Sequence, residues 1–412
     1  MRISTDLYAD ELVEAVRWFM QLAMDDIANR LHSLAMEAQG NQLLSRHYGE
    51  TFKLELAMAT IFAEVARGAL PPLEGSLAEA YSFIAMYYRV HQNLTERGKR
   101  RFEQQLRSYY NQAYGFRPLA FELTIATHFF KAGCDVAFTD TEGTARHEYL
   151  VSKDGHELEV ECKAISNDAG RMIDRLGLCK VGHALLPLAD EHVRSAETKL
   201  LTVTIPERLS NLTSQQIEEL AASASSTLTT LQPPEGGTFE MSLDVHPGLL
   251  LPPEARTYAE INRYVHEQTG GPGKHVLIRA ERSTGRMVCI TLQSRVPDDV
   301  VGKMLERTTK AANQMSRQRS SMIALQITDM PPEHLAELFH TPSGLHHIAA
   351  QTFNGPPRRP HVNMVAFSAL PVGNAFDPET GASSVSAQVA AIRNPNAAFP
   401  SSLIDNPGTF DI

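Results

Sequence analysis

The stretch that decides the fold is EYLVSKDGHELEVECK, residues 148–163. It has the pattern of two strands joined by Asp154-Gly155, a dipeptide that favours tight hairpin turns. This turn fixes a register in which Glu148 lies opposite Glu161. A register shifted by one residue would move Glu148 to the apolar face of the hairpin, so the turn and the hydrophobic pattern agree.

Side chains alternate between the two faces of a strand, which separates an apolar face from a charged one. The face expected to pack in the core holds Tyr149, Val151, Leu158, Val160 and Cys162. The opposite face holds Glu148, Glu157, Glu159, Glu161 and Lys163. Glu157 and Glu159, near the turn, are expected to be solvent-facing charges, whereas Glu161 and Lys163 should lie inside the sheet.

Directly opposed like charges destabilise a strand pair, so Glu148 facing Glu161 calls for a positive charge between them. A hard divalent cation such as Mg²⁺ suits two carboxylates. The alternative is a solvent-facing hairpin in which Lys163 only neutralises Glu161.

The composition is that of a globular protein. The 412 residues are 43% hydrophobic and 21% charged, with a formal net charge of −10. These values exclude a disordered chain and a protein that coats nucleic acid non-specifically, but they allow a local basic groove. The four cysteines form no CxxC pair, which suits a reducing cytosol. Without a signal core or a long apolar run, we expect a cytoplasmic protein that does not cross a membrane.

The pattern of elements divides the chain into five regions. Residues 1–115 have helical periodicity, and residues 116–175 read as a helix, a strand and the hairpin. Residues 176–300 alternate strands with helices, and residues 301–370 begin with a long helix followed by the apolar strand SSMIALQITDM. Residues 371–412 are rich in Pro, Ala, Ser and Asn and are expected to be poorly ordered.

A helix bearing a glutamate, then a hairpin with an acid, then a strand ending in (D/E)xK resembles the PD-(D/E)XK nuclease superfamily. The matching pieces are FELTIATHFFKAGCDVAF, HEYLV and VECKA, within residues 115–175, and the helix and strand at 300–330 look like the next unit. The resemblance implies an α/β protein with a restriction-endonuclease-like core, a mixed sheet flanked by helices. To this core the chain adds an all-helical N-terminal domain and an α/β insertion.

The resemblance also implies a site for Mg²⁺ or Mn²⁺. In the family, two acids and the backbone carbonyl between the second acid and the lysine bind the metal. These roles fall to Glu148, Glu161 and the carbonyl of Cys162. Lys163 then corresponds to the catalytic lysine, and Glu122, on the preceding helix, corresponds to an accessory catalytic glutamate.

One position departs from the family pattern. His147-Glu148 stands where the family usually has an Asp preceded by Pro or another small or apolar residue, and Asp140 is a second candidate ligand. Two functions therefore stay open. The first is a metal-dependent nuclease acting on DNA rather than RNA, in defence or DNA processing. The second is a catalytically degenerate module of the same fold that binds nucleic acid or a protein partner.

Three basic segments are candidates for nucleic-acid binding. In the helix expected at 301–316, one face holds Lys303, Arg307, Lys310 and Gln314. The segment after the ECK strand contains Arg171 and Arg175. A basic face can follow a phosphate backbone, but a solvated helix face is an equally good interpretation for the first segment.

The third basic segment, TERGKRRFEQQLRSYYNQAYGF at 95–116, combines five Lys and Arg residues with three tyrosines. Here we favour a solvated face with packing tyrosines. The N-terminal helices are expected to position substrate or a protein partner. Because many nucleases of the family work in pairs, a homodimer is also expected.

Overall fold

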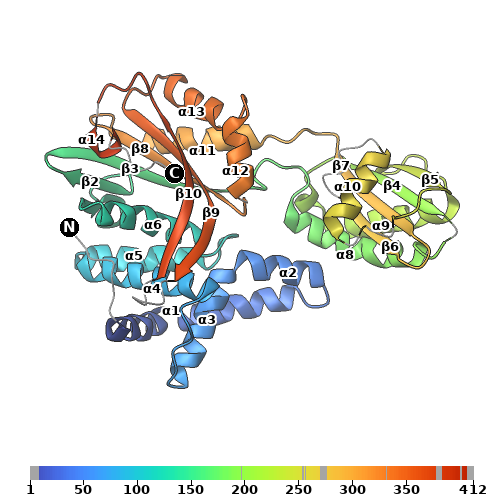
Figure 1. Ribbon diagram of the computed structural model, residues 1–412, viewed down its shortest axis with the longest axis horizontal. Helices are drawn as coiled ribbons and strands as arrows, with labels where there is room; N and C mark the ends of the chain where they lie inside the picture. The colour runs from blue at the N-terminus through green and yellow to red at the C-terminus, as the bar shows by residue number, and fades with distance from the viewer. Residues whose placement is uncertain are drawn as a thin grey trace. The chain divides into compact units, whose positions relative to one another are not determined.

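The computed structural model describes residues 9–195, 197–252, 255, 257–269, 276–330, 332–376, 383–399 and 401–405. These residues form fourteen α-helices and two mixed sheets (Figure 1). In the described ranges, no helix is both long enough and apolar enough to cross a membrane. The chain divides into two compact units: unit 1 comprises residues 1–37, 48–167 and 300–412, and unit 2 comprises residues 38–47 and 168–299.

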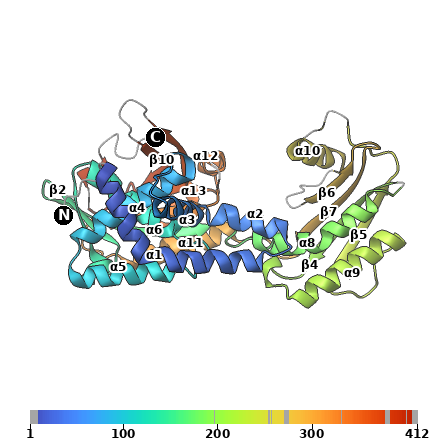
Figure 2. The same ribbon diagram turned by 90° about the horizontal axis from the view of Figure 1, so that it is seen from below.

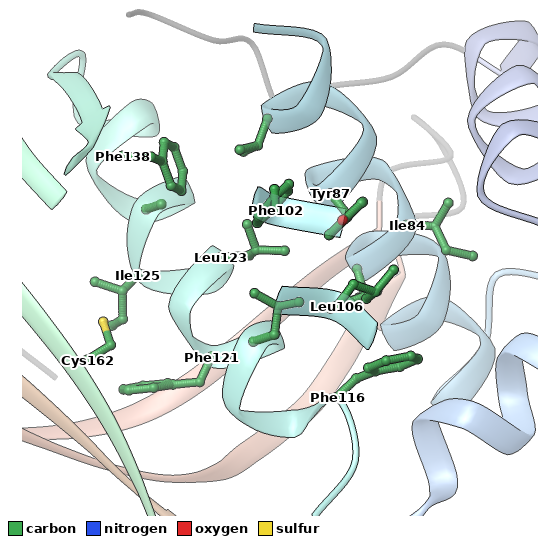
Figure 3. Close-up of a cluster of buried hydrophobic side chains, with 14 of the residues drawn as sticks. Ile84, Tyr87, Phe102, Leu106, Phe116, Phe121, Leu123, Ile125, Phe138 and Cys162 are labelled. Atoms are coloured by element: carbon green, nitrogen blue, oxygen red, sulfur yellow. The ribbon is translucent and has the colours of Figure 1, made fainter. Parts of the chain in front are cut away.

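Five helices occupy the N-terminal region, as the periodicity predicted. They are α1 (Ala9–Glu37), α2 (Gln42–Thr51), α3 (Lys53–Ala66), α4 (Gly75–Asn93) and α5 (Glu96–Tyr109). Aromatic packing joins them: the Tyr87 ring of α4 stacks on the Phe102 ring of α5 with centroids 4.2 Å apart (Figure 3). The same hydrophobic cluster contains residues of α6 (Arg117–Lys131) and of the large sheet. Residues 1–37 and 48–115 therefore belong to the same unit as the large sheet, where the sequence suggested a separate helical domain over residues 1–115, and residues 38–47 belong to unit 2.

The large sheet of unit 1 has the order β1–β2–β3–β8–β9–β10. Its strands are β1 (Asp135–Phe138), β2 (Tyr149–Lys153), β3 (His156–Ser166), β8 (Ser321–Thr328), β9 (Val362–Phe376) and β10 (Ser383–Arg393). The first three strands are antiparallel, β3, β8 and β9 run parallel, and β10 returns antiparallel to β9. This order places β3 between β2 and β8, inside the sheet, as predicted for the ECK strand.

The hairpin has the predicted register. Tyr149 pairs with Val160, and Lys153 pairs with His156 next to the turn. Asp154 and Gly155 both have positive φ, 52° and 80°, the backbone conformation that an Asp-Gly turn of this kind requires. The last β2–β3 pair is Tyr149–Val160, whereas β3 continues for another six residues alongside β8.

Helices cover both faces of the large sheet (Figure 1). α6 packs on the face that holds Val160 and Cys162. The other face is covered by α11 (Val300–Gln314), which precedes β8, and by α13 (Leu345–Asn354), which packs against α11. In the chain, α12 (Pro332–His340) lies between β8 and α13. Every residue of β8 is buried, which agrees with the continuous apolar run of a central parallel strand.

Part of the segment 371–412, expected to be poorly ordered, forms regular structure, while residues 377–382, 400 and 406–412 lie outside the described residues. β9 extends to Phe376, β10 pairs with it, and α14 (Ser402–Asp405) follows. Val389 and Ala391 of β10 pack against the hydrophobic cluster of unit 1. The small and polar composition suggested a tail because it lacks the branched and aromatic residues typical of strands.

Unit 2 contains the second sheet, of order β5–β4–β7–β6 (Figure 2). Its strands are β4 (Thr198–Ile205), β5 (Glu240–His246), β6 (Val276–Glu281) and β7 (Arg286–Ser294), within the region where the sequence predicted strands alternating with helices. Its helices are α8 (Arg175–His192), η1 (Leu209–Asn211), α9 (Ser214–Thr230) and α10 (Tyr258–Thr269). Leu201 faces α8 and α9, and its neighbour Leu200 faces α10, so this sheet is also covered on both sides.

A buried carboxyl fixes the start of α6. Oε1 of Glu55, on α3, accepts a hydrogen bond from the Phe116 N–H at 2.7 Å. Gly115 has φ +52°, and a Cβ there would lie 1.8 Å from Oε1 of Glu55, so the close approach requires glycine. Burial raises the pKa of Glu55 to about 7, although the bond from Phe116 and the nearby charge of Arg117 partly offset it.

Replacing Glu55 with Gln should change how stability depends on pH. Because the folded pKa is about 7 and the ordinary value is 4.5, the folded protein holds this proton more tightly than the unfolded chain does. Stability from this group is therefore full below pH 4.5 and is lost as the pH rises to about 7. We therefore expect the unsubstituted protein to lose about 2–3 kcal/mol of unfolding free energy, relative to Glu55→Gln, between about pH 5 and about pH 8. Urea unfolding of the two proteins measures this difference. Parallel pH profiles for the two proteins would contradict this account.

Candidate active site

The predicted acid–lysine group gathers where β2 and β3 separate. The carboxylate of Glu161, on β3, is completely buried, and its Oε1 pairs with the ammonium of Lys163 two residues further on. Its Oε2 accepts a hydrogen bond from the Glu148 N–H at 3.2 Å. The opposition of Glu148 and Glu161 that the hairpin register predicted is therefore a direct contact in the structure.

Glu122 of α6 is held in place mainly by α5. The Tyr109 O–H donates to Oε1 of Glu122, and Nε2 of Gln105 donates to Oε2, both at 3.1 Å. The Tyr149 O–H of β2 donates to the backbone carbonyl of Glu122 at 2.6 Å, which ties α6 to the hairpin. Gln105 and Tyr109 were not predicted as site residues. Their spacing of four, which places both on one helix face, was the available signal.

Three carboxyl groups share one cation in this site. Burial raises the pKa of Glu122 to about 7, and the charge of Glu161 adds to the rise. Burial, Glu122 and Glu161 together raise the pKa of Glu148 well above its usual range. Burial also raises the pKa of Glu161, although Lys163 opposes this rise.

The lysine responds in the opposite sense. Burial alone would lower the pKa of Lys163, but the charges of Glu161, Glu148 and Glu122 outweigh burial and raise it. The Lys163 side chain therefore stays protonated. Its single positive charge does not balance the three carboxyl groups around it. The site is arranged to gain from one more cation.

These residues fit a hard divalent cation. Within the part of the chain that the structure describes, the Glu148 carboxylate has no hydrogen-bond or ion-pair partner. In the same residues, no group of three or more His, Cys, Asp and Glu side chains forms a ready-made metal site. Mg²⁺ commonly uses only one or two carboxylates and keeps several waters. Glu148, Glu161 and the carbonyl of Cys162, which follows the last β2–β3 pair, are a donor set of that kind.

Asp140 also lies near the acids, as part of the short helix α7 (Thr139–Glu142). After burial and the nearer carboxyls, its charge contributes to the raised pKa of Glu148. Thr139 fixes the backbone that enters β2: its N–H donates to the Glu148 carbonyl at 2.9 Å and its hydroxyl to the His147 carbonyl at 2.6 Å. Helix α7 therefore positions the backbone of Glu148.

The expectation that Glu159 faces solvent was wrong. Glu159 is completely buried, and its Oε2 accepts a hydrogen bond from the Ser316 N–H at 2.8 Å. Nε of Arg319 lies 3.5 Å from Oε1 of Glu159, and Nδ1 of His147 lies 3.9 Å from Oε2. The chain between α11 and β8 covers this part of the strand, a long-range contact that no local pattern shows. Glu157 is exposed, as predicted, and pairs with Arg319 at 2.8 Å.

Helix α11 carries its basic residues as predicted. Lys303, Arg307 and Lys310 are exposed, and the neighbouring Met304, Thr308 and Ala311 are buried. Lys303 forms an ion pair with Glu306 at 2.9 Å, and Nε2 of Gln314 donates to the Arg146 carbonyl at 3.3 Å. Within the described residues, this bond from Gln314 joins α11 to the segment that carries Glu148.

Arg171 and Arg175, the basic candidates that follow the ECK strand, belong to unit 2. Nη1 of Arg171 lies 3.8 Å from Oδ2 of Asp298. Nε of Arg175 lies 3.9 Å from Oδ2 of Asp168, whose carboxylate also accepts the Arg175 N–H at 3.2 Å. Both arginines therefore have carboxylate partners within their own unit.

No protein-family model, curated protein or solved structure matches this chain. What the site can do therefore follows from its own geometry and charge. The features that bear on function are the buried Glu161–Lys163 pair, the unpaired carboxylate of Glu148 and the oriented carboxylate of Glu122.

Replacing Glu148 with Gln should have opposite effects with and without metal. Without metal, the substitution removes a carboxyl that burial and two like charges disfavour, so the melting temperature should rise. With Mn²⁺ at 100 times its Kd, the unsubstituted protein should gain about 2.7 kcal/mol, which the variant should lose. Scanning calorimetry with Mn²⁺ and with EDTA measures both effects. Glu157→Gln, which removes an exposed acid from the same strand, is the matched control, and an unchanged Mn²⁺ shift in Glu148→Gln would contradict the assignment.

Proposed function

We propose that this protein is a metal-dependent nuclease that hydrolyses phosphodiester bonds, with DNA as the favoured substrate. The observation that carries the proposal is the convergence of Glu122, Glu148, Glu161 and Lys163 where β2 and β3 separate. Such a group of acids around one lysine has the charge that a bound Mg²⁺ or Mn²⁺ would balance. Strongly perturbed pKa values in one place also favour a functional site over a structural ion pair.

The order of elements supports the same proposal. A glutamate-bearing helix precedes three antiparallel strands, and the third of these runs parallel to a strand that follows another helix. This order is the one expected for a restriction-endonuclease-like core, with unit 2 placed between β3 and α11. In this interpretation, residues 116–167 and 300–370 supply the core and the N-terminal helices support Glu122.

Each side chain has a role that its surroundings favour. The Glu161 carboxylate fixes the Lys163 ammonium, which can stabilise negative charge on the phosphoryl oxygens or orient the attacking water. Gln105 and Tyr109 orient Glu122 so that its carboxylate can accept a proton. A bound Mg²⁺ would lower the pKa of a coordinated water and neutralise phosphate charge. Glu148, Glu161 and the Cys162 carbonyl would hold that ion.

A second function has one specific observation in its favour. Both carboxylate oxygens of Glu161 already have partners within the protein, Lys163 and the Glu148 N–H. A site that satisfies itself in this way suits a catalytically degenerate module that binds nucleic acid or a protein partner. The presence of Glu at position 148, where the resembled family usually has Asp, favours the same alternative.

Cleavage assays separate the two functions. Purified protein is incubated with single-stranded, linear and supercoiled DNA and with RNA, in Mg²⁺, Mn²⁺ or EDTA. We expect metal-dependent cleavage that falls by about 10²–10³ in Lys163→Ala, because the ammonium acts on charge that develops during the reaction. Glu157→Gln should cleave like the unsubstituted protein. The nuclease proposal fails if no substrate is cut with any metal or if Lys163→Ala cuts at the same rate.

A further inference from the structure

Helix α5 is strongly basic in an acidic protein. Between Glu96 and Tyr109 it carries five Lys or Arg side chains and two Glu side chains, a net charge of +3, while the chain as a whole has −10. Its inner face is apolar and fixed: Phe102 and Leu106 are buried in the cluster shown in Figure 3. The charges are therefore confined to the outer face of a helix whose orientation is set by packing.

Three arginines form a row on that outer face. Arg97, Arg100 and Arg107 are exposed, and their spacings of three and seven residues place them on one side of the helix. Among the described residues, none of the three has a carboxylate partner, and the one hydrogen bond in the row runs from Nε of Arg100 to the Glu96 carbonyl at 3.2 Å. Arg97 and Arg100 are like charges three residues apart, a spacing that destabilises a helix and that a bound anion would relieve.

Helix α5, which carries the row, lies beside the candidate active site. At one end of α5, the Thr95 N–H donates to Oε1 of Glu142 at 2.9 Å, which joins the helix to α7. Nη2 of Arg101 lies 3.9 Å from Oδ1 of Asp140 in the same short helix. At the other end, Gln105 and Tyr109 hold Glu122. Helix α5 therefore spans the distance from α7 to Glu122 and borders the carboxyl group.

The position of α5 next to the carboxyl groups suits the electrostatics of the proposed reaction. Three carboxyls repel a phosphate backbone, so a strand reaches them only if nearby cations supply the attraction. Helix α11 is the rival surface, but its Lys303 is already paired with Glu306 and none of its charged side chains contacts the acids in the described structure. Among the described helices, α5 is the one that combines unpaired guanidinium groups with side chains that bind Glu122.

We infer that Arg97, Arg100 and Arg107 on α5 bind the phosphate backbone of the nucleic-acid strand that the site cleaves. The inference rests on the proposed function and extends it, because it names the surface that holds the substrate. Guanidinium groups suit this task since each forms two parallel hydrogen bonds with a phosphate. The inner face of the same helix positions Glu122, so α5 serves the substrate on one side and the catalytic group on the other.

The test measures binding without cleavage. Fluorescence anisotropy of a labelled oligonucleotide, single-stranded and duplex, is recorded in EDTA over a series of salt concentrations. The variant carries Arg97→Gln, Arg100→Gln and Arg107→Gln, which keep good helix formers in place. Its affinity should fall more than tenfold, and the slope of log K against log salt should become shallower by about 2–3. The variant with Lys at the same three positions should keep the slope, since the charges remain.

The rival surface supplies the matched comparison. A triple variant of α11, Lys303→Gln with Arg307→Gln and Lys310→Gln, removes the same charge and should lose less affinity than the α5 variant. The inference is overturned if the unsubstituted protein binds neither oligonucleotide, if the α5 variant binds normally with an unchanged melting temperature, or if the α11 variant loses more. Failure of the nuclease proposal looks different: binding depends on α5, but no metal produces cleavage.

Discussion

The site depends on how the sheet accommodates a completely buried carboxylate in its interior. Burying an isolated carboxylate costs several kcal/mol unless charged and hydrogen-bonding partners compensate it. Lys163 and the Glu148 N–H are those partners for Glu161. Because side chains alternate along β3, the packing that turns Cys162 into the core obliges Glu161 and Lys163 to share the opposite face. The packing of the apolar face of β3 therefore determines where its charged side chains lie.

The N-terminal helices complete this arrangement. They share one hydrophobic cluster with α6, so the position of Glu122 is set by contacts on several sides. Glu55 and Gly115 fix the start of the helix, and the Tyr149 O–H ties the Glu122 backbone to β2. A side chain held by packing and by hydrogen-bond donors keeps its orientation when a ligand arrives, which is the preorganisation that catalysis requires.

The sequence predicted what local patterns control. The Asp154-Gly155 turn was enough to pair the hairpin correctly, and helical periodicity predicted the N-terminal helices. It did not predict the burial of Glu159 or the pairing of β10 with β9. The β9–β10 pair joins neighbouring strands, but its small and polar composition is not typical of strands. The burial of Glu159 depends on the segment after α11, which is distant in the chain and which no local period records. The contact of Tyr109 with Glu122 was missed for the same reason, since it joins two helices.

The burial of the Glu148 carboxyl beside two like charges is the feature of the site that a purely structural role explains least. Thr139 and Glu161 hold the backbone of Glu148, so its longer side chain starts from a fixed point. In a site with only a structural role, neutral amides at positions 122 and 148 would avoid the burial of these carboxyls and their repulsion by neighbouring charges. Burial and then Glu161 raise the pKa of Glu122, and burial, Glu122 and Glu161 raise the pKa of Glu148, a stability cost of the kind found where function requires it. A bound divalent cation would turn that repulsion into attraction, and the same glutamates would then stabilise the fold.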